Sequence, residues 1–335
     1  MRLFAGAIHS IQASFLKWFI YFIRVMPYHA AIGTGRFFGM LAWLCIPLHR
    51  KIAYIQMESA LGTVDEKTLT RKVFMHQGDI VIDMIRFSYM DDDELKKRVI
   101  IDGREHLEAA TASGRGVMMI TGHMNWEILG HLPRLTGIEF CIMGDIIKNE
   151  AVQAVIEDIR SRCGITLLPP KGGMVAMLTG ELKEGRIIGI VIDQRGKRES
   201  KVFCDFFGLP APTNPAPAFI ALKGDALILP VSAVKEGDVY RFTFEKPIDT
   251  REFGDDFHAI DKLHDCWKSE AVRKSSDLMQ AWLCSVIRET PGQWFWLHSR
   301  WLRRSEMKHV LKSGKDFAKY VKTQADSYLG KDSMV

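Results

Sequence analysis

The chain has 335 residues, of which 47% are hydrophobic and 25% are charged. This length allows one large or two ordinary domains, and the composition excludes collagen-like, low-complexity and polytopic membrane proteins. The formal net charge of +5 lies entirely in residues 1–60, which hold six basic residues and one acidic residue. A basic, aromatic N-terminus on a neutral body favours an anionic membrane surface over nucleic acid as partner.

Two apolar stretches open the chain. Residues 3–26 are interrupted by Lys17 and Arg24, so no uncharged run approaches the roughly 18–20 residues of a typical spanning helix. The two cations share one face of a helix whose other positions are largely apolar, which suits a helix lying in the interface. The second stretch, 37–48, ends at three basic residues, as expected where a chain returns to the cytoplasm. We expect residues 1–60 to form membrane-associating helices; core helices of a soluble domain are the alternative.

From residue 104 onward, helical and strand patterns alternate. Helices are predicted over 104–113, 123–135, 151–162 and 174–184, and strands over 116–121, 140–143, 165–168 and 187–192. A rigid proline-rich loop at 209–217 precedes a short helix near 218–222, strands over 226–234 and 239–245, and a long helix over 261–289. This alternation predicts an α/β fold with a central, mostly parallel sheet flanked by helices. We expect this domain to occupy residues 61–310 and a polar, solvated tail to follow at 311–335.

Two polar residues follow predicted strands. His123 comes after 116–121 and Asp193 after 187–192, and ligands usually gather at the carboxyl ends of parallel strands, so both can face one crevice. Glu127 lies four residues after His123, so the two side chains would share a helix face. A histidine oriented by a carboxylate is the usual arrangement of a general base, and the helix N-terminus would offer N–H groups to a developing anion. A surface ion pair is the alternative for His123 and Glu127.

Other chemistries find less support. The sequence has no GxSxG elbow, no P-loop and no GxGxxG after a strand, so neither a serine nucleophile nor a nucleotide cofactor is expected. The six cysteines are scattered without zinc-ligand spacing, which indicates reduced thiols and no metal site. Arg160 and Arg162 lie on the predicted helix 151–162, where a guanidinium suits a phosphate or a carboxylate, or is simply solvated.

Four ordered segments carry a recognisable pattern: GHMNWEILG, IVIDQRG, FCDFFGLPAPTNPAPAFIALKGDALILPV and PGQWFWLHSRW. Together they resemble the bacterial lipid A biosynthesis (late) acyltransferases, within the lysophospholipid acyltransferase-like superfamily, and the resemblance covers nearly the full length. It implies an enzyme on the cytoplasmic face of the bacterial inner membrane. Such an enzyme moves a fatty acyl chain from an acyl-carrier-protein or coenzyme A thioester to a lipid hydroxyl, with no further cofactor.

The resemblance also implies roles for individual residues. His123 would be the base and Glu127 its orienting partner, although the family usually has four residues between the histidine and the acid and this chain has three. Arg160 would lie near a substrate phosphate. Asp193 would match the family's acid at a strand end, and we expect substrate contacts from the residues beside these positions, Asn125, Gln194 and Arg195. Three alternatives stay open: another lipid acceptor, a catalytically inactive lipid-binding scaffold, and a thioesterase that uses water as acceptor.

Overall fold

The computed structural model describes residues 2–63, 65–143, 149–168 and 173–330. Its central sheet has the strand order β1-β9-β8-β2-β5-β3-β4, in which each neighbouring pair is parallel except β8 with β9. A short strand, β10, pairs antiparallel with β8, and β6 and β7 form a separate hairpin. The predicted α/β fold with a mostly parallel sheet is therefore confirmed. The strands are β1 (Val99–Asp102), β2 (Val117–Thr121), β3 (Cys141–Met143), β4 (Thr166–Leu168), β5 (Ile187–Val191), β6 (Phe203–Phe206), β7 (Leu209–Pro212), β8 (Leu227–Glu236), β9 (Val239–Phe244) and β10 (Ile248–Asp249).

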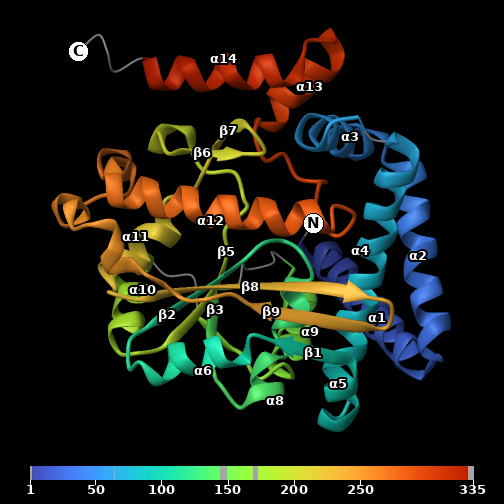
Figure 1. The fold of residues 1–335 in the computed structure, drawn as a ribbon. Helices are drawn as coiled ribbons and strands as arrows, with labels where there is room; N and C mark the ends of the chain where they lie inside the picture. The colour runs from blue at the N-terminus through green and yellow to red at the C-terminus, as the bar shows by residue number, and fades with distance from the viewer. Residues whose placement is uncertain (1, 64, 144–148, 169–172, 331–335) are drawn as a thin grey trace.

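Helices cover both faces of the sheet (Figure 1). The α-helices are α1 (Arg2–Val25), α2 (Tyr28–Cys45), α3 (Pro47–Leu61), α4 (Glu66–Tyr89), α5 (Asp92–Arg98), α6 (Arg104–Ala112), α7 (Trp126–Leu129), α8 (Leu132–Thr136), α9 (Glu150–Ser161), α10 (Met174–Lys183), α11 (Ala216–Lys223), α12 (Glu270–Glu289), α13 (Arg304–Ser313) and α14 (Phe317–Leu329). Short 3-10 turns lie at η1 (Arg198–Ser200), η2 (Thr250–Phe253), η3 (Asp256–Ala259) and η4 (Leu263–Lys268).

The alternating side chains of the central strands build two cores. Met118 and Ile120 of β2 pack on one face with residues of α10, α11 and α12. Val117 and Met119 point to the other face and pack with residues of α6 and α8. Because successive side chains of a strand point to opposite faces, a continuous apolar run such as that of β2 is typical of a strand covered on both sides.

Glycines let α2 and α4 pack in close contact. A Cβ atom on Gly35 would lie 2.6 Å from the Gly78 carbonyl oxygen, and Cβ atoms on Gly39 or Gly78 would clash with the facing backbone. The adjacent face of α2 carries Arg36, whose guanidinium pairs with the buried Asp79 of α4 at 3.0 Å. Close backbone contact and the Arg36–Asp79 ion pair thus help to hold α2 to α4.

Helices α1 and α2 also expose large apolar side chains. Trp18 is 58% exposed and Phe37 is 64% exposed, and the two helices meet where the rings of Phe19 and Phe38 lie 6.2 Å apart. Within the described residues no single helix is long and apolar enough to cross a membrane, whereas α2 and α3 together reach the composition of a span but bend by 92° between them. The membrane association of residues 1–60 therefore stays a prediction.

Helix α3 joins the N-terminal segment to the body of the protein. Its Ile52, Ala53 and Met57 are buried in the same core as β2. The fully buried Gln56 donates to the carbonyl oxygens of Trp296 and His298 at 3.0 and 2.9 Å, and its own oxygen accepts from the Arg300 N–H at 2.9 Å. The loop after α12 therefore takes its conformation partly from a residue 240 positions earlier in the chain.

Three predicted elements differ from the structure. The helix expected over 123–135 is a loop followed by α7 and α8, because Asn125 adopts a left-handed backbone conformation (φ 55°) and Pro133 cannot continue a helix from α7. Part of the expected loop 209–217 is strand β7, which pairs with β6. The long helix expected over 261–289 begins at Glu270, where the Ser269 side chain caps it by accepting from the Val272 N–H.

The C-terminal region is not a solvated tail. Helix α14 buries Phe317, Val321 and Ala325, and two of these belong to the core that contains β2. Residues 331–335 of the expected tail lie outside the described residues.

Candidate active site

The carboxyl ends of β2 and β5 bring His123 and Asp193 together. The two strands pair in parallel, with Thr121 opposite Val191, and each polar residue follows two positions later. The His123 Nδ1 atom lies 2.6 Å from Asp193 Oδ1, and the His123 backbone N–H donates to Asp193 Oδ2 at 2.7 Å. The carboxylate thus holds both the ring and the backbone of the histidine.

The surroundings of Asp193 keep it ionised. Its side chain is fully buried, and Oδ2 also accepts from the Trp294 indole N–H at 2.6 Å. Burial by itself raises the pKa of a carboxyl, but the hydrogen bonds and charge of His123, together with the nearby His298, hold the pKa of Asp193 well below its usual range. Asp193 therefore serves as a fixed negative charge beside the ring.

The geometry assigns the protons on His123. Since Asp193 accepts from Nδ1, that nitrogen carries the proton and Nε2 keeps the lone pair with which it could act as a base. Nε2 lies 3.3 Å from the Gln194 side-chain amide, at the surface, and the histidine side chain is 17% exposed. Burial lowers the pKa of His123, but the hydrogen bond and charge of Asp193 and the charge of Glu127 raise it above its usual value.

Gly122 makes this close approach possible. A Cβ atom at this position would lie 2.7 Å from Leu283 Cδ1 and 3.3 Å from Asp193 Oδ2. A larger residue would therefore push the loop away from the carboxylate that orients the histidine.

Within the described residues Glu127 does not hydrogen-bond with His123, and the carboxylate that contacts the ring is that of Asp193. The reason is local: His123 precedes α7, and the i,i+4 contact of a helix does not apply to it. Glu127 instead accepts from Arg160 Nη2 of α9 at 3.3 Å. Burial raises the pKa of Glu127, although the charge of Arg160 opposes this effect.

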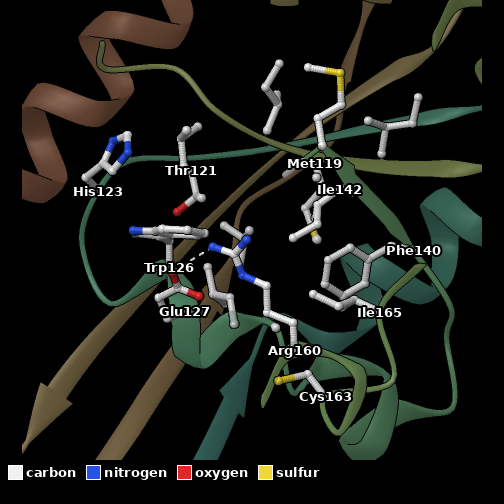
Figure 2. Close-up of a pocket in the computed structure, with 18 of the residues that line it drawn as sticks. Met119, Thr121, His123, Trp126, Glu127, Phe140, Ile142, Arg160, Cys163 and Ile165 are labelled. Carbon is white, nitrogen blue, oxygen red and sulfur yellow. Dashed lines mark hydrogen bonds and ion pairs between the residues drawn. The ribbon is translucent and has the colours of Figure 1, made fainter. Parts of the chain in front are cut away.

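Trp126 links these two pairs. Its ring centroid lies 5.7 Å from that of His123 and 5.9 Å from the Arg160 guanidinium carbon. Figure 2 shows His123 on one side of the Trp126 ring and the Glu127–Arg160 pair on the other. The histidine and the ion pair thus face the same space.

This space is a cavity of about 380 Å³ that changes from polar to apolar along its length. His123, Glu127, Arg160 and Gln194 make its polar part. In Figure 2 the side chains of Phe140, Ile142 and Ile165 lie away from His123. The apolar lining comprises Met119, Leu129, Phe140, Ile142, Met143, Ile165, Leu178, Ile188, Ile190, Val191 and Val231. A site of this form fits a long apolar group with one reactive polar end.

Asn125 and Arg195, which were expected to contact substrate, do not line the cavity. Asn125 is fully buried, and its amide bonds to His76 at 2.8 Å, to the Ala233 carbonyl at 2.8 Å and to Gln293 at 2.7 Å, so it anchors the loop after His123 instead of lining the cavity. Arg195 is half-buried, donates to the Gly196 carbonyl at 3.2 Å and does not line the cavity.

Some contributors were not singled out for the site from the sequence. Trp294 bonds to Asp193, and His298 packs against both, with its Nε2 3.3 Å from the Asp193 carbonyl oxygen. Trp294 and His298 both lie in PGQWFWLHSRW, the fourth segment of the family pattern, and this was the one sequence feature that could have pointed to them. The remaining candidate nucleophile in the cavity, Cys163, is buried, and burial raises its pKa to about 11. Within the described residues, no cluster of three or more His, Cys, Asp or Glu side chains could hold a metal ion.

Comparison with known proteins identifies relatives of this site and fold. A phosphatidylinositol mannoside acyltransferase of Mycobacterium tuberculosis (strain CDC 1551 / Oshkosh) is 24% identical over 226 residues, 66% of each chain. A lipid A biosynthesis acyltransferase of Haemophilus influenzae (strain ATCC 51907 / DSM 11121 / KW20 / Rd) is 22% identical over 228 residues, 68% of this chain and 66% of the relative. The chain therefore aligns with slightly less than two thirds of the length of each relative.

A sequence profile described as bacterial lipid A biosynthesis acyltransferase matches residues 8–303. Because this match spans most of the sequence, the chain belongs to the bacterial lipid A biosynthesis acyltransferase family.

Proposed function

We propose that this protein transfers a fatty acyl chain from a thioester to a hydroxyl group of a membrane lipid. One observation carries the proposal: a histidine with an unprotonated Nε2, held at Nδ1 by a buried carboxylate, stands at the polar end of an otherwise apolar cavity. The apolar part would hold the acyl chain, since each buried methylene contributes about 0.8 kcal/mol. The names of the relatives support a lipid acceptor, either a lipid A precursor or a glycolipid.

In the proposed reaction, His123 Nε2 takes the proton of the acceptor hydroxyl while its oxygen attacks the thioester carbonyl carbon. The tetrahedral intermediate then collapses, the carbon–sulfur bond breaks and the thiolate takes the proton back from Nε2. Asp193 stabilises the imidazolium formed between these two steps. No covalent acyl-enzyme is required.

Arg160 is the proposed donor to the oxyanion. Helix α7 has only four residues, so the extended N-terminus expected over 123–135 does not supply a row of free N–H groups. The Arg160 guanidinium lines the same cavity as His123, and Glu127 fixes it. Losing one such donor typically costs about a hundredfold or more in rate. Gln194, beside Nε2, would move to admit the acceptor hydroxyl.

We further propose that α1 and α2 dock on the membrane at the cytoplasmic face of the bacterial inner membrane. Each of these helices exposes large apolar side chains: Phe15, Trp18 and Phe22 on α1, and Phe37 and Leu41 on α2. Basic residues in the same segment favour anionic lipids. The donor would be an acyl-carrier-protein or coenzyme A thioester, with no metal or further cofactor.

The test uses purified full-length protein, vesicles of bacterial lipid and acyl thioesters of both donor types, with lipid products measured by mass spectrometry. We expect a lipid heavier by one acyl group with the wild type and not with His123→Gln. Free fatty acid in the absence of a lipid hydroxyl would identify a thioesterase. Lipid binding without any product, unchanged in His123→Gln, would identify a scaffold and refute the proposal.

A further inference from the structure

We infer that Gly189 sets the length of the acyl chain that the cavity accepts. This inference rests on the proposed function and concerns the end of the cavity away from His123. Gly189 lies in β5, four residues before Asp193, or about 13 Å along the strand from the catalytic carboxylate. Gly189 lines the cavity, and because glycine has no side chain, it adds only backbone to the cavity wall.

The sheet register shows what surrounds Gly189. Gly189 pairs with Met119 of β2 on one side and with Ile142 of β3 on the other, so the three residues form one row across the sheet. Paired residues on adjacent strands project to the same face, and Met119 and Ile142 both line the cavity. The missing side chain at 189 is thus a gap between two large ones.

On β2 and β5 this row is the last on its face to line the cavity, whereas beside β3 and β4 the lining continues with Phe140 and Ile165. The next row on the same face, Val117 and Ile187, is buried in the core and does not line it. The row nearer the catalytic pair, Thr121 and Val191, does line it. An acyl chain running from the thioester at His123 along this face would therefore pass Gly189 where β2 and β5 stop lining the cavity and Phe140 and Ile165 form its wall.

A side chain at position 189 would enter the cavity wall beside Ile142 and Phe140. A Cβ atom there would lie 3.1 Å from Ile142 Cγ2 and 3.3 Å from two carbons of the Phe140 ring. These are tight contacts that small shifts can relieve, so alanine fits while closing part of the space. Its backbone does not require glycine, because Gly189 is not among the residues with positive φ.

The experiment measures kcat/KM for a series of saturated acyl thioesters from 8 to 18 carbons on the donor that the wild type uses. For Gly189→Ala we expect the preferred length to fall by one or two methylenes. Each methylene that can no longer be buried should cost about fourfold in kcat/KM, the equivalent of about 0.8 kcal/mol. Gly180→Ala is the matched control, because a Cβ at this position in α10 meets nothing within 4 Å and Gly180 does not line the cavity. This control should keep the wild-type preference for acyl-chain length.

Ile142→Ala provides the opposite test, since it enlarges the space facing Gly189 and should shift the preference to longer chains. Opposite shifts in the two variants support the inference, and a shift in Ile142→Ala alone supports it if Gly189→Ala does not fold by circular dichroism. A uniform loss at all lengths, or an unchanged preference in both folded variants, overturns it. If the wild type transfers no acyl chain from any thioester, the proposed function fails instead.

Discussion

Replacing Asp193 with asparagine should remove most of the activity by changing which nitrogen of His123 carries the proton. In the wild type one carboxylate oxygen accepts from Nδ1–H, and the other accepts from the His123 backbone N–H and the Trp294 indole at 2.7 and 2.6 Å. Asparagine has one acceptor oxygen. If that oxygen keeps the two N–H donors, its NH₂ group faces Nδ1 and favours the tautomer protonated at Nε2, which cannot act as a base.

The magnitude follows from both effects. Loss of a correctly protonated general base typically lowers kcat/KM by a factor of 10² to 10⁴, or about 3–5 kcal/mol in the activation free energy. The alternative amide orientation leaves buried N–H donors without an acceptor and should lower the free energy of unfolding by about 1–3 kcal/mol. The variant should therefore be less active and somewhat less stable, and its folding is checked by circular dichroism.

The pH profile of kcat/KM separates a positioning role from a merely structural one. His123 must be neutral to accept a proton, so activity falls as the pH drops through its raised pKa. Without the Asp193 charge that pKa is lower, and the acid limb of the residual activity should move to lower pH. Glu127→Gln is the control, because Glu127 adds a weaker charge effect and does not fix the tautomer. An Asp193→Asn variant within tenfold of the wild type, with an unchanged acid limb, would refute this reasoning.

Three further predictions concern stability and membrane binding. Gly39→Ala should lower the free energy of unfolding by about 1–3 kcal/mol, because its Cβ would clash with the α4 backbone. Gly33→Ala, on the open face of α2, should be neutral or stabilising. Urea titration measures both variants, and equal effects would contradict the close packing of α2 and α4. Burial, and secondarily the charge of Arg134, lowers the pKa of His131 to about 3. Between about pH 6.5 and pH 3 the unfolded state therefore binds more protons than the folded state, and the free energy of unfolding should fall by about 1.4 kcal/mol for each unit of decreasing pH. Urea titrations at pH 7 and pH 5 should show a weaker pH dependence for His131→Gln than for the wild type. Trp18→Ser should weaken co-sedimentation with anionic vesicles about tenfold, and unchanged binding would argue against docking through α1.

The sequence predicted the sheet well because its strands are short apolar runs covered on both faces. The 116–121 and 187–192 runs could hardly form anything else between helical patterns, and the ends of adjacent parallel strands place His123 near Asp193. Periodicity could not reveal the break after His123, since the left-handed Asn125 is stabilised by partners 49, 108 and 168 residues away. The helical spacing of Glu127 thus suggested a contact that the loop does not make.

The sequence allowed the proximity of His123 and Asp193 to be predicted, but it did not reveal the residues that contact Asp193 from elsewhere in the chain. Trp294 and His298 lie after the last predicted helix, 101 and 105 residues beyond Asp193, and only the folded chain brings them against its carboxylate and its backbone carbonyl. The buried face of α14 escaped prediction for a similar reason: it consists of Phe317, Val321 and Ala325, spaced four residues apart among polar and charged residues, so its packing depends on the core that it meets.

The hydrogen bonds of Gln56 bear on how the protein can be shortened. Deleting residues 1–60 to obtain a detergent-free form would remove the side chain that holds the backbone at 296, 298 and 300. That backbone follows directly from Trp294, which donates a hydrogen bond to the buried Asp193 carboxylate. In addition to their proposed membrane docking, residues 1–60 thus help to hold the candidate active site in place. A version trimmed at residue 60 should therefore bind substrate poorly and turn over slowly even when it is supplied with micelles.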